Sequence, residues 1–301
     1  MNLRYLVSIT ILATVTSSLS AVRNDATQGH VHAGRILCWG DSLTAGAGGE
    51  GVTFPEVLSQ ILGEEVKNDG VGGQTSSQIA QRVGAIPIIV SVIGDHIPGN
   101  GAVELVKILN APVSKNATLP GKLLHINGLL IRDVNEKFTF ERLASGNPVK
   151  VIGGAEFEAN VDVDANDRVI IWAGRNDRTQ VEMVEANVAD MVRLVRSKGA
   201  DFIVISILNG IWEPRGSVGY RQISEINDSF AHTYGDHYLD VREWLVSQFD
   251  RRNLGDNLDH DADIPPRSLR SDGLHLNAIG YSRLGAFLAS RLEESPSAMR
   301  R

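Results

Sequence analysis

Ser42 stands at the end of an apolar run, in the stretch from Ile36 to Ser42 with the sequence ILCWGDS. An apolar run that ends at glycine is typical of a buried strand and its exit loop. Ligands of open parallel sheets bind beyond the carboxyl ends of the strands, so a nucleophile would be well placed there. A serine hydroxyl attacks a carbonyl only when a base takes its proton and donors stabilise the oxyanion. The remainder of the chain must supply those groups.

Asp272 and His275 are candidates for the base and for the group that orients it. A spacing of three residues on a turn or a first helical turn lets the carboxylate reach the imidazole. A carboxylate on one ring nitrogen fixes the tautomer, and the other nitrogen can then accept the proton of Ser42. The sequence therefore predicts that segments near the two ends of the chain meet in the fold.

Two glycine-containing segments offer donors for an oxyanion. Asn176, in the segment Gly174–Asp177, has an amide N–H with no charge to repel an oxyanion. Gly73 offers a backbone N–H with no side chain in the way, and the N–H of Ser42 is a third candidate. The loss of one such donor typically lowers the rate by about 10²–10³-fold.

Together these segments resemble the sequence blocks of GDSL-type lipases/esterases of the SGNH hydrolase superfamily. The matching segments, in the family's order, are Gly40–Leu43, Asn68–Thr75, Gly174–Asp177 and Asp272–His275. The resemblance implies that Ser42 is the nucleophile, His275 the base, Asp272 the residue that orients it, and Gly73 and Asn176 oxyanion donors. It implies neither a metal ion nor a cofactor.

Each segment taken alone has a structural explanation. The Asp41-Ser42 pair suits a turn, and Asp177 suits a helix cap. The combination, in this order, predicts a serine hydrolase. An α/β-hydrolase does not fit, because Thr44 stands where the second glycine of Gly-x-Ser-x-Gly would be, and the acid is close to the base in sequence.

Strand and helix patterns alternate in the two regions that carry these segments. We expect strands at 36–39, 169–173, 202–208 and 238–241, and helices at 55–62, 75–83, 181–198, 220–234, 243–249 and 277–292. Such alternation predicts right-handed βαβ units and a parallel sheet covered on both faces. We therefore expect an α/β fold, a three-layer α/β/α sandwich of the flavodoxin-like type that the resemblance implies. This catalytic domain would comprise residues 33–85 and 161–293.

Residues 86–160 have a different pattern, with short strand-like runs and frequent turn residues. Asn127-Gly128 is a two-residue hairpin signal between apolar runs. Phe138 and Phe140 alternate with polar neighbours, as on a half-buried strand. We expect an inserted antiparallel β subdomain without catalytic residues. The segment 250–271 is polar and is expected to be a loop.

Composition excludes several classes of protein. The 301 residues have 43% hydrophobic and 22% charged residues, which is typical of a globular fold. A net charge of −7 argues against a nucleic-acid partner, because phosphates require a basic surface. Cys38 is the only cysteine, so the chain forms no internal disulfide and no cysteine-ligated zinc site.

The first 20 residues have the features of a secretory signal peptide. Arg4 gives a positive start, an apolar stretch follows, and small residues near Ala21 suit cleavage. We expect a secreted or periplasmic protein without stable membrane insertion. An uncleaved membrane anchor is the alternative, although the apolar stretch is short for a span of about 20 residues.

Further residues are weaker candidates for the site. Asp41 and Trp212 are predicted to bind substrate, with two alternatives: that Asp41 holds the nucleophile loop, and that Trp212 serves packing. Tyr220 is a similar candidate. The acidic segment 259–263 could suggest a cation site, but a solvated acidic loop is the simpler interpretation.

We expect a secreted esterase that hydrolyses short acyl esters, especially acetyl groups on carbohydrate. The motives are the signal peptide, the lack of a long apolar lid segment, and a β insert that could contact a glycan. A lipid or lysophospholipid esterase is one alternative. A carbohydrate-binding or adhesion protein that keeps the scaffold without turnover is another. The sequence leaves the acyl group, the alcohol and the oligomeric state open.

Overall fold

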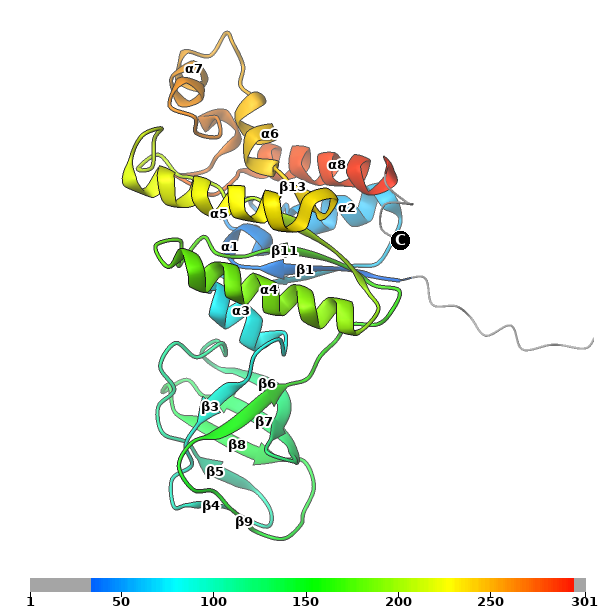
Figure 1. Ribbon diagram of the computed structural model, residues 1–301, viewed down its shortest axis with the longest axis vertical. Helices are drawn as coiled ribbons and strands as arrows, with labels where there is room; N and C mark the ends of the chain where they lie inside the picture. Colours follow the sequence, from blue (N-terminus) through cyan, green and yellow to red (C-terminus); the bar gives the residue numbers. More distant parts are fainter. Residues whose placement is uncertain (1–33, 295–301) are drawn as a thin grey trace, which may run out of the picture. The chain divides into compact units, whose positions relative to one another are not determined.

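The computed structural model describes residues 34–294 (Figure 1). The predicted signal peptide, residues 1–20, lies outside the described residues. Among the described residues, no helix is both long enough and apolar enough to cross a membrane.

A five-stranded sheet carries the predicted catalytic segments. Its strands, in spatial order, are β13 (Tyr238–Leu239), β12 (Asp201–Ile205), β11 (Arg168–Trp172), β1 (Ile36–Gly40) and β2 (Val66–Gly70). All neighbouring pairs are parallel, as predicted. The chain leaves β1 toward β2 on one side and later returns to β11 on the other. The order of strands thus reverses between β1 and β11, and ligands of such sheets bind beyond the strand ends at this point.

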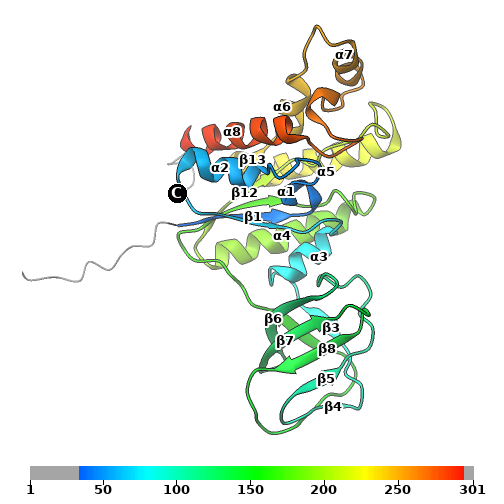
Figure 2. The same ribbon diagram turned by 180° about the vertical axis from the view of Figure 1, so that it is seen from behind.

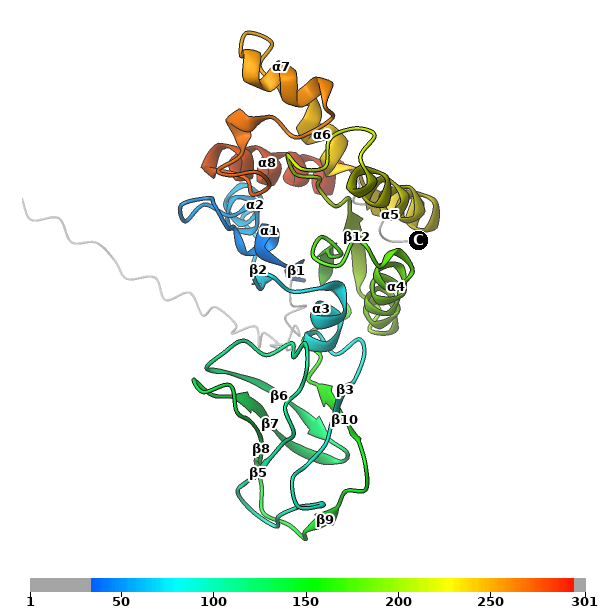
Figure 3. The same cartoon turned by 90° about the vertical axis from the view of Figure 1, so that its left-hand side faces the viewer.

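Helices cover both faces of this sheet, which confirms the predicted α/β fold (Figures 1 and 3). The side chains of β1 alternate between the faces. Leu37 and Trp39 pack with α3 (Ser76–Arg82), α4 (Val181–Ser197) and α5 (Val218–Tyr234). Ile36 and Cys38 face the other way, where the core is formed with α1 (Ser42–Ala45), α2 (Phe54–Leu62), α6 (Val241–Ser247) and α8 (Ala278–Glu294).

A separate antiparallel sheet lies within residues 88–159 (Figure 2). Its strands, in spatial order, are β3 (Ile88–Val90), β10 (Ala155–Ala159), β6 (Ala117–Leu123), β7 (Ile126–Arg132), β8 (Phe138–Arg142) and β5 (Ala102–Glu104). The short strands β4 (His96–Ile97) and β9 (Val149–Lys150) form a further pair. Phe138 and Phe140 are buried here with Phe157, as their alternation predicted. Antiparallel β-structure is thus confirmed, whereas the division into two domains stays a prediction.

The predicted hairpin turn at Asn127-Gly128 is wrong. Both residues lie inside β7, and the β6–β7 turn falls at Leu124-His125 instead. Gly128 is needed in the strand because a Cβ there would lie 2.3 Å from the ring of Phe140. The glycine therefore makes room for an aromatic side chain in the core, and turn chemistry does not decide its place.

The segment 250–271 is also not a loop throughout. It contains α7 (Leu254–Asp261), with Asn253 as its N-cap, and the 3₁₀ turn Arg267–Leu269. A second 3₁₀ turn, Gly235–His237, precedes β13. The polar composition of α7 hides it in the sequence, because its stability comes from caps and ion pairs and not from an apolar stripe.

Candidate active site

Ser42 is the first residue of α1, directly after the turn that ends β1. Asp41 caps this helix, and its Oδ1 accepts a hydrogen bond of 2.9 Å from the Leu43 N–H. The turn requires Gly40, since a Cβ there would lie 2.1 Å from Thr44 Oγ1 and 2.8 Å from the Trp172 carbonyl oxygen. Ser42 therefore lies at the carboxyl end of a strand, beside the point where the strand order reverses.

His275 and Asp272 meet Ser42 as predicted from their residue types. His275 Nε2 lies 3.0 Å from Ser42 Oγ, and His275 Nδ1 lies 2.8 Å from Asp272 Oδ2. The other carboxylate oxygen, Oδ1, accepts hydrogen bonds of 2.7 Å from the N–H groups of Leu274 and His275. Burial alone would raise the pKa of Asp272, but these hydrogen bonds from His275 and Leu274 outweigh it and lower the pKa. The carboxylate is therefore ionised and orients the imidazole toward Ser42.

Asn176 joins the segments that contain Ser42 and Gly73. Its exposed side chain donates from Nδ2 to the Gln74 carbonyl oxygen at 2.8 Å and to Asp41 Oδ2 at 3.2 Å. Asp41 precedes Ser42, and Gln74 follows Gly73.

Gly73 has a φ of +76°, a left-handed conformation that glycine adopts without strain. A Cβ built at this position would have no described atom within 4 Å, whereas one built on Gly72 would lie 4.0 Å from Ser42 Cβ. The backbone of this turn is therefore close to the serine and open on the side of Gly73.

Asp41 does not lie where it could touch substrate, which corrects its prediction as a substrate-binding residue. It is 1% exposed, and both carboxylate oxygens receive hydrogen bonds from within the protein. Burial raises its pKa to about 6, although the Leu43 N–H and the nearby Arg175 and His275 act in the opposite direction. Asp41 holds the nucleophile loop and Asn176, as the alternative interpretation proposed.

A buried ion pair beside Asn176 is absent from the sequence-based prediction. Arg175 donates to Glu213 from Nη1 at 3.2 Å and from Nη2 at 2.9 Å, and both side chains are buried. Glu213 also accepts from the Gly210 N–H at 2.8 Å and pairs with Arg178. Burial lowers the pKa of Arg175. The ion pair connects the segment of Asn176 to the loop that follows β12. The sequence does not predict this pair, because a single glutamate in a polar loop does not indicate a buried partner.

Asp177 binds the first turn of a helix that is distant in sequence. Its carboxylate accepts from the Ser76 N–H at 3.0 Å and from Ser76 Oγ at 2.6 Å, at the start of α3. The neighbouring helix α4 begins at Val181, and its N-cap residue Gln180 makes no capping hydrogen bond through its side chain. Asp177 therefore ties the Asn176 segment to the helix that follows Gly73.

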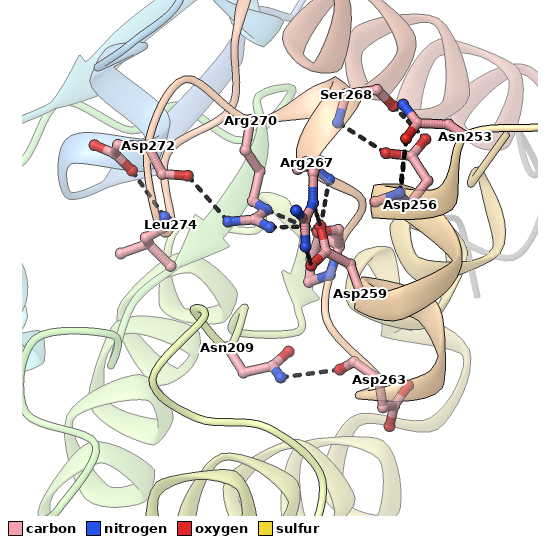
Figure 4. A network of polar contacts seen from close by, with 12 residues as sticks. Asn209, Asn253, Asp256, Asp259, Asp263, Arg267, Ser268, Arg270, Asp272 and Leu274 are labelled. Atoms are coloured by element: carbon pink, nitrogen blue, oxygen red, sulfur yellow. Dashed lines mark hydrogen bonds and ion pairs between the residues drawn. The ribbon is translucent and has the colours of Figure 1, made fainter.

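Arg270 supports the other side of the site (Figure 4). It donates from Nη1 to the Asp272 carbonyl oxygen at 3.0 Å, from Nε to the Pro265 carbonyl oxygen at 2.8 Å, and from Nη2 to Asp259 Oδ2 at 2.8 Å. Arg267 forms a second ion pair with Asp259. The interpretation of 259–263 as a solvated acidic loop is therefore wrong. Residues 34–294 contain no group of three His, Cys, Asp or Glu side chains placed to hold a metal ion.

Trp212 and Tyr220 have different environments. Trp212 is 56% exposed, and its ring is so close to Gly273 that a Cβ there would lie 2.4 Å from Trp212 Cζ3. It thus stands next to the Asp272–His275 segment, and its role in substrate binding stays a prediction. The hydroxyl of Tyr220 donates to Asp263, and the guanidinium of Arg242 lies over its ring. Tyr220 therefore serves packing.

Comparison with known proteins gives one curated relative and several solved structures. The tail spike protein of Salmonella phage epsilon15 is 24% identical over 246 residues, which cover 72% of this chain and 22% of that protein. The chain thus spans about a fifth of the length of this relative. A G-D-S-L family lipolytic protein from Desulfitobacterium hafniense DCB-2 is 17% identical, with a TM-score of 0.47 over 86% of this chain and 99% of the other. A family member from Veillonella parvula DSM 2008 is 14% identical, with a TM-score of 0.48 over 87% and 98%.

The family model described as GDSL-like Lipase/Acylhydrolase matches residues 126–283. The matched residues include the segments of Asn176 and His275, whereas Ser42 and Gly73 precede them. Because the match covers more than half of the 301 residues, this chain belongs to the GDSL-like lipase/acylhydrolase family of carboxylic ester hydrolases.

Proposed function

We propose that the protein is a serine esterase that removes short acyl groups, acetyl above all, from carbohydrate through an acyl-enzyme on Ser42. The observation that carries the catalytic part is the continuous contact from Ser42 Oγ to His275 Nε2 at 3.0 Å and from His275 Nδ1 to Asp272 at 2.8 Å. This arrangement suits a nucleophile with its base and the group that orients the base.

In the first half of the reaction, Ser42 Oγ attacks the ester carbonyl carbon and His275 Nε2 takes the hydroxyl proton. Asp272 stabilises the imidazolium that forms. The carbonyl oxygen becomes an oxyanion, for which the N–H groups of Ser42 and Gly73 and the amide of Asn176 are the proposed donors. The C–O bond to the alcohol then breaks, and His275 gives its proton to the leaving oxygen.

In the second half, water attacks the acyl group on Ser42. His275 takes a proton from the water, and the same donors receive the second oxyanion. When this intermediate collapses, the acid leaves and the proton returns to Ser42 Oγ. The balance is one ester and one water consumed, and one acid and one alcohol released, with no metal or cofactor in any step.

Three features support the choice of substrate and location. The predicted signal peptide would direct the protein to the periplasm or the exterior, where acylated glycans are accessible. The loop between β5 and β6 contacts the segment after Gly73, since Gln74 and Gln78 donate hydrogen bonds to the Pro112 and Ala111 carbonyl oxygens. The exposed Trp212 beside Gly273 offers an aromatic face, which suits a sugar ring.

A fluorophosphonate probe tests the role of Ser42. The unmodified protein should be labelled, Ser42→Ala should not, and the control Ser282→Ala, on the exposed face of α8, should be labelled as fully as the unmodified protein. A protein that is folded but not labelled would support the alternative of a carbohydrate-binding protein on the same scaffold.

A substrate comparison tests the choice of ester. Acetate release from acetylated glycans and hydrolysis of p-nitrophenyl acetate should be faster than hydrolysis of long-chain and lysophospholipid esters. Faster hydrolysis of the long-chain esters would favour the lipid esterase instead. The location is tested by N-terminal sequencing of the protein recovered from the periplasm or the medium. A chain that still begins with residues 1–20 would contradict the proposed cleavage.

A further inference from the structure

A pocket of about 460 Å³ lies beside the Asp272–His275 segment. Its lining comes from the loop after β12, from α7 and the residues after it, and from the segment of Arg270 and Asp272. The apolar part of the lining consists of Ile211, Pro214, Leu258, Ala262 and Ile264. Pockets of about 300–1,000 Å³ are typical of small-molecule sites, so this one is larger than an acetyl group requires.

The pocket lies beside the turn that carries His275, the residue that would protonate the leaving alcohol. His275 must protonate the leaving oxygen, so the alcohol lies toward the imidazole, while the oxyanion points toward the opposite donors. Asp272 and Gly273 form part of the pocket wall, and the Ile211 N–H donates to the Gly273 carbonyl oxygen at 2.9 Å. The wall is therefore built on the same turn that carries His275. Glu213, two residues after Ile211, pairs with Arg175, the residue before Asn176.

The lining combines apolar and polar groups in a way that fits a sugar ring. Ile211 and Leu258 are about half exposed and offer apolar surface to the C–H faces of a ring. Arg267 has a half-exposed side chain at the same pocket, where its guanidinium can donate to a hydroxyl group while it stays paired with Asp259. A long acyl chain would cover this guanidinium without offering it a polar group.

We propose that this pocket is the subsite for the alcohol part of the substrate, and that it binds the pyranose ring that carries the ester oxygen. The inference rests on the proposed function. Leu258 is then a specificity-determining residue, because its side chain projects from α7 into the pocket wall.

The test uses Leu258→Trp, which adds bulk to the pocket, and the matched control Leu254→Trp. Leu254 lies one turn earlier on α7, is more exposed than Leu258, and does not line the pocket. One substrate series keeps the acetyl group and changes the alcohol part of the ester. It compares ethyl acetate with a methyl pyranoside that carries one O-acetyl group. The other keeps the ethyl group and lengthens the acyl group from acetate to hexanoate.

Leu258→Trp should lower kcat/KM for the acetylated pyranoside relative to ethyl acetate by about ten-fold, mainly through KM. The order of rates within the ethyl ester series should not change, and Leu254→Trp should match the unmodified protein in both series. A changed acyl preference would overturn the inference, because the pocket would then hold the acyl chain. Equal losses on ethyl acetate and on the pyranoside would also overturn it.

The labelling rate with fluorophosphonate separates this inference from the proposed function. Leu258→Trp should be labelled as fast as the unmodified protein, since its catalytic residues are unchanged. If the unmodified protein is neither labelled nor active on any of these esters, the proposed function itself fails. If it is labelled and hydrolyses ethyl acetate but not the pyranoside, only the assignment of the pocket fails.

Discussion

The two main sheets of this protein differ in what they bury. Among residues 34–294, every buried polar or charged side chain lies outside residues 86–160, in the part built on the parallel sheet. The antiparallel region buries apolar side chains such as Phe138, Phe140 and Phe157. A buried charge is costly unless it is paired, so it persists where it positions something. In the parallel-sheet region, Arg175, Glu213, Asp259 and Arg270 hold the loops that form the site.

This contrast teaches where substitutions affect chemistry and where they affect only folding. In the antiparallel region, a lost contact should lower stability without changing the catalytic groups. Near the parallel sheet, the same loss of stability should come with a loss of rate, because the buried charges and the catalytic residues share their loops. The following substitutions test the contrast from the largest expected effect to the smallest.

Asp272→Asn should have the largest effect. The amide has a similar shape but cannot stabilise the imidazolium, and it favours the wrong tautomer of His275, so kcat should fall by about 10⁴-fold. The measurement is steady-state hydrolysis of p-nitrophenyl acetate. Asp133→Asn in the antiparallel region is the control, and it should leave kcat unchanged. A loss of less than ten-fold for Asp272→Asn would contradict the role given to this carboxylate.

Glu213→Gln and Phe140→Ala compare a buried ion pair with a buried ring. Removal of the charge from Glu213 leaves Arg175 buried without its counterion and should lower the free energy of unfolding by about 3–5 kcal/mol. Phe140→Ala should cost about the same, 3–5 kcal/mol, through the cavity that it leaves. Urea denaturation measures both losses. At a temperature where both variants are folded, only Glu213→Gln should lower kcat. Equal kcat values for the two variants would contradict the proposed difference between the two regions.

Asn176→Ala removes a proposed oxyanion donor. The expected loss in kcat is about 10²–10³, with a smaller change in KM, because the amide would act mainly on the transition state. Asn135→Ala, on the exposed surface of the antiparallel region, is the matched control. If KM rises while kcat is constant, then Asn176 binds substrate and does not stabilise the oxyanion.

Asp41→Asn should change how stability depends on pH. The pKa of Asp41 in the folded protein is raised to about 6, above the value of an unfolded aspartate, so the folded state binds the extra proton. The stability from this group is therefore present below about pH 4 and is lost as pH rises through about 6. Relative to Asp41→Asn, the unmodified protein should lose about 3 kcal/mol over this range. Parallel curves of unfolding free energy against pH would contradict the raised pKa.

Much of the fold follows from local patterns. The apolar run before Gly40 predicts β1, and the spacing of Val184, Val188, Met191 and Val195 predicts the buried face of α4. Thr75 with Gln78 forms the capping box at the start of α3. These features depend on residues close in sequence, so the sequence alone is sufficient to predict them.

Other features depend on contacts between segments that are distant in sequence, and the sequence patterns did not predict them. Gly128 looks like a turn residue, but the ring of Phe140 from the next strand determines its place in β7. The polar helix α7 has no apolar stripe, and ion pairs from Asp259 to Arg267 and Arg270 hold its end. The sequence position of Asp177 predicts a cap for the helix that follows it, yet its carboxylate binds Ser76 in the first turn of α3.

By itself, the sequence determined which residues could form the site, since Ser42, Gly73, Asn176, Asp272 and His275 have the required chemistry in the required order. Only the tertiary structure decided which groups hold them. Asp41 accepts a hydrogen bond from Asn176, Glu213 pairs with Arg175, and Arg270 donates to the Asp272 carbonyl oxygen. The physical reason is that a catalytic group is recognised by its own chemistry. A supporting charge, in contrast, acquires its role from a partner that folding brings to it.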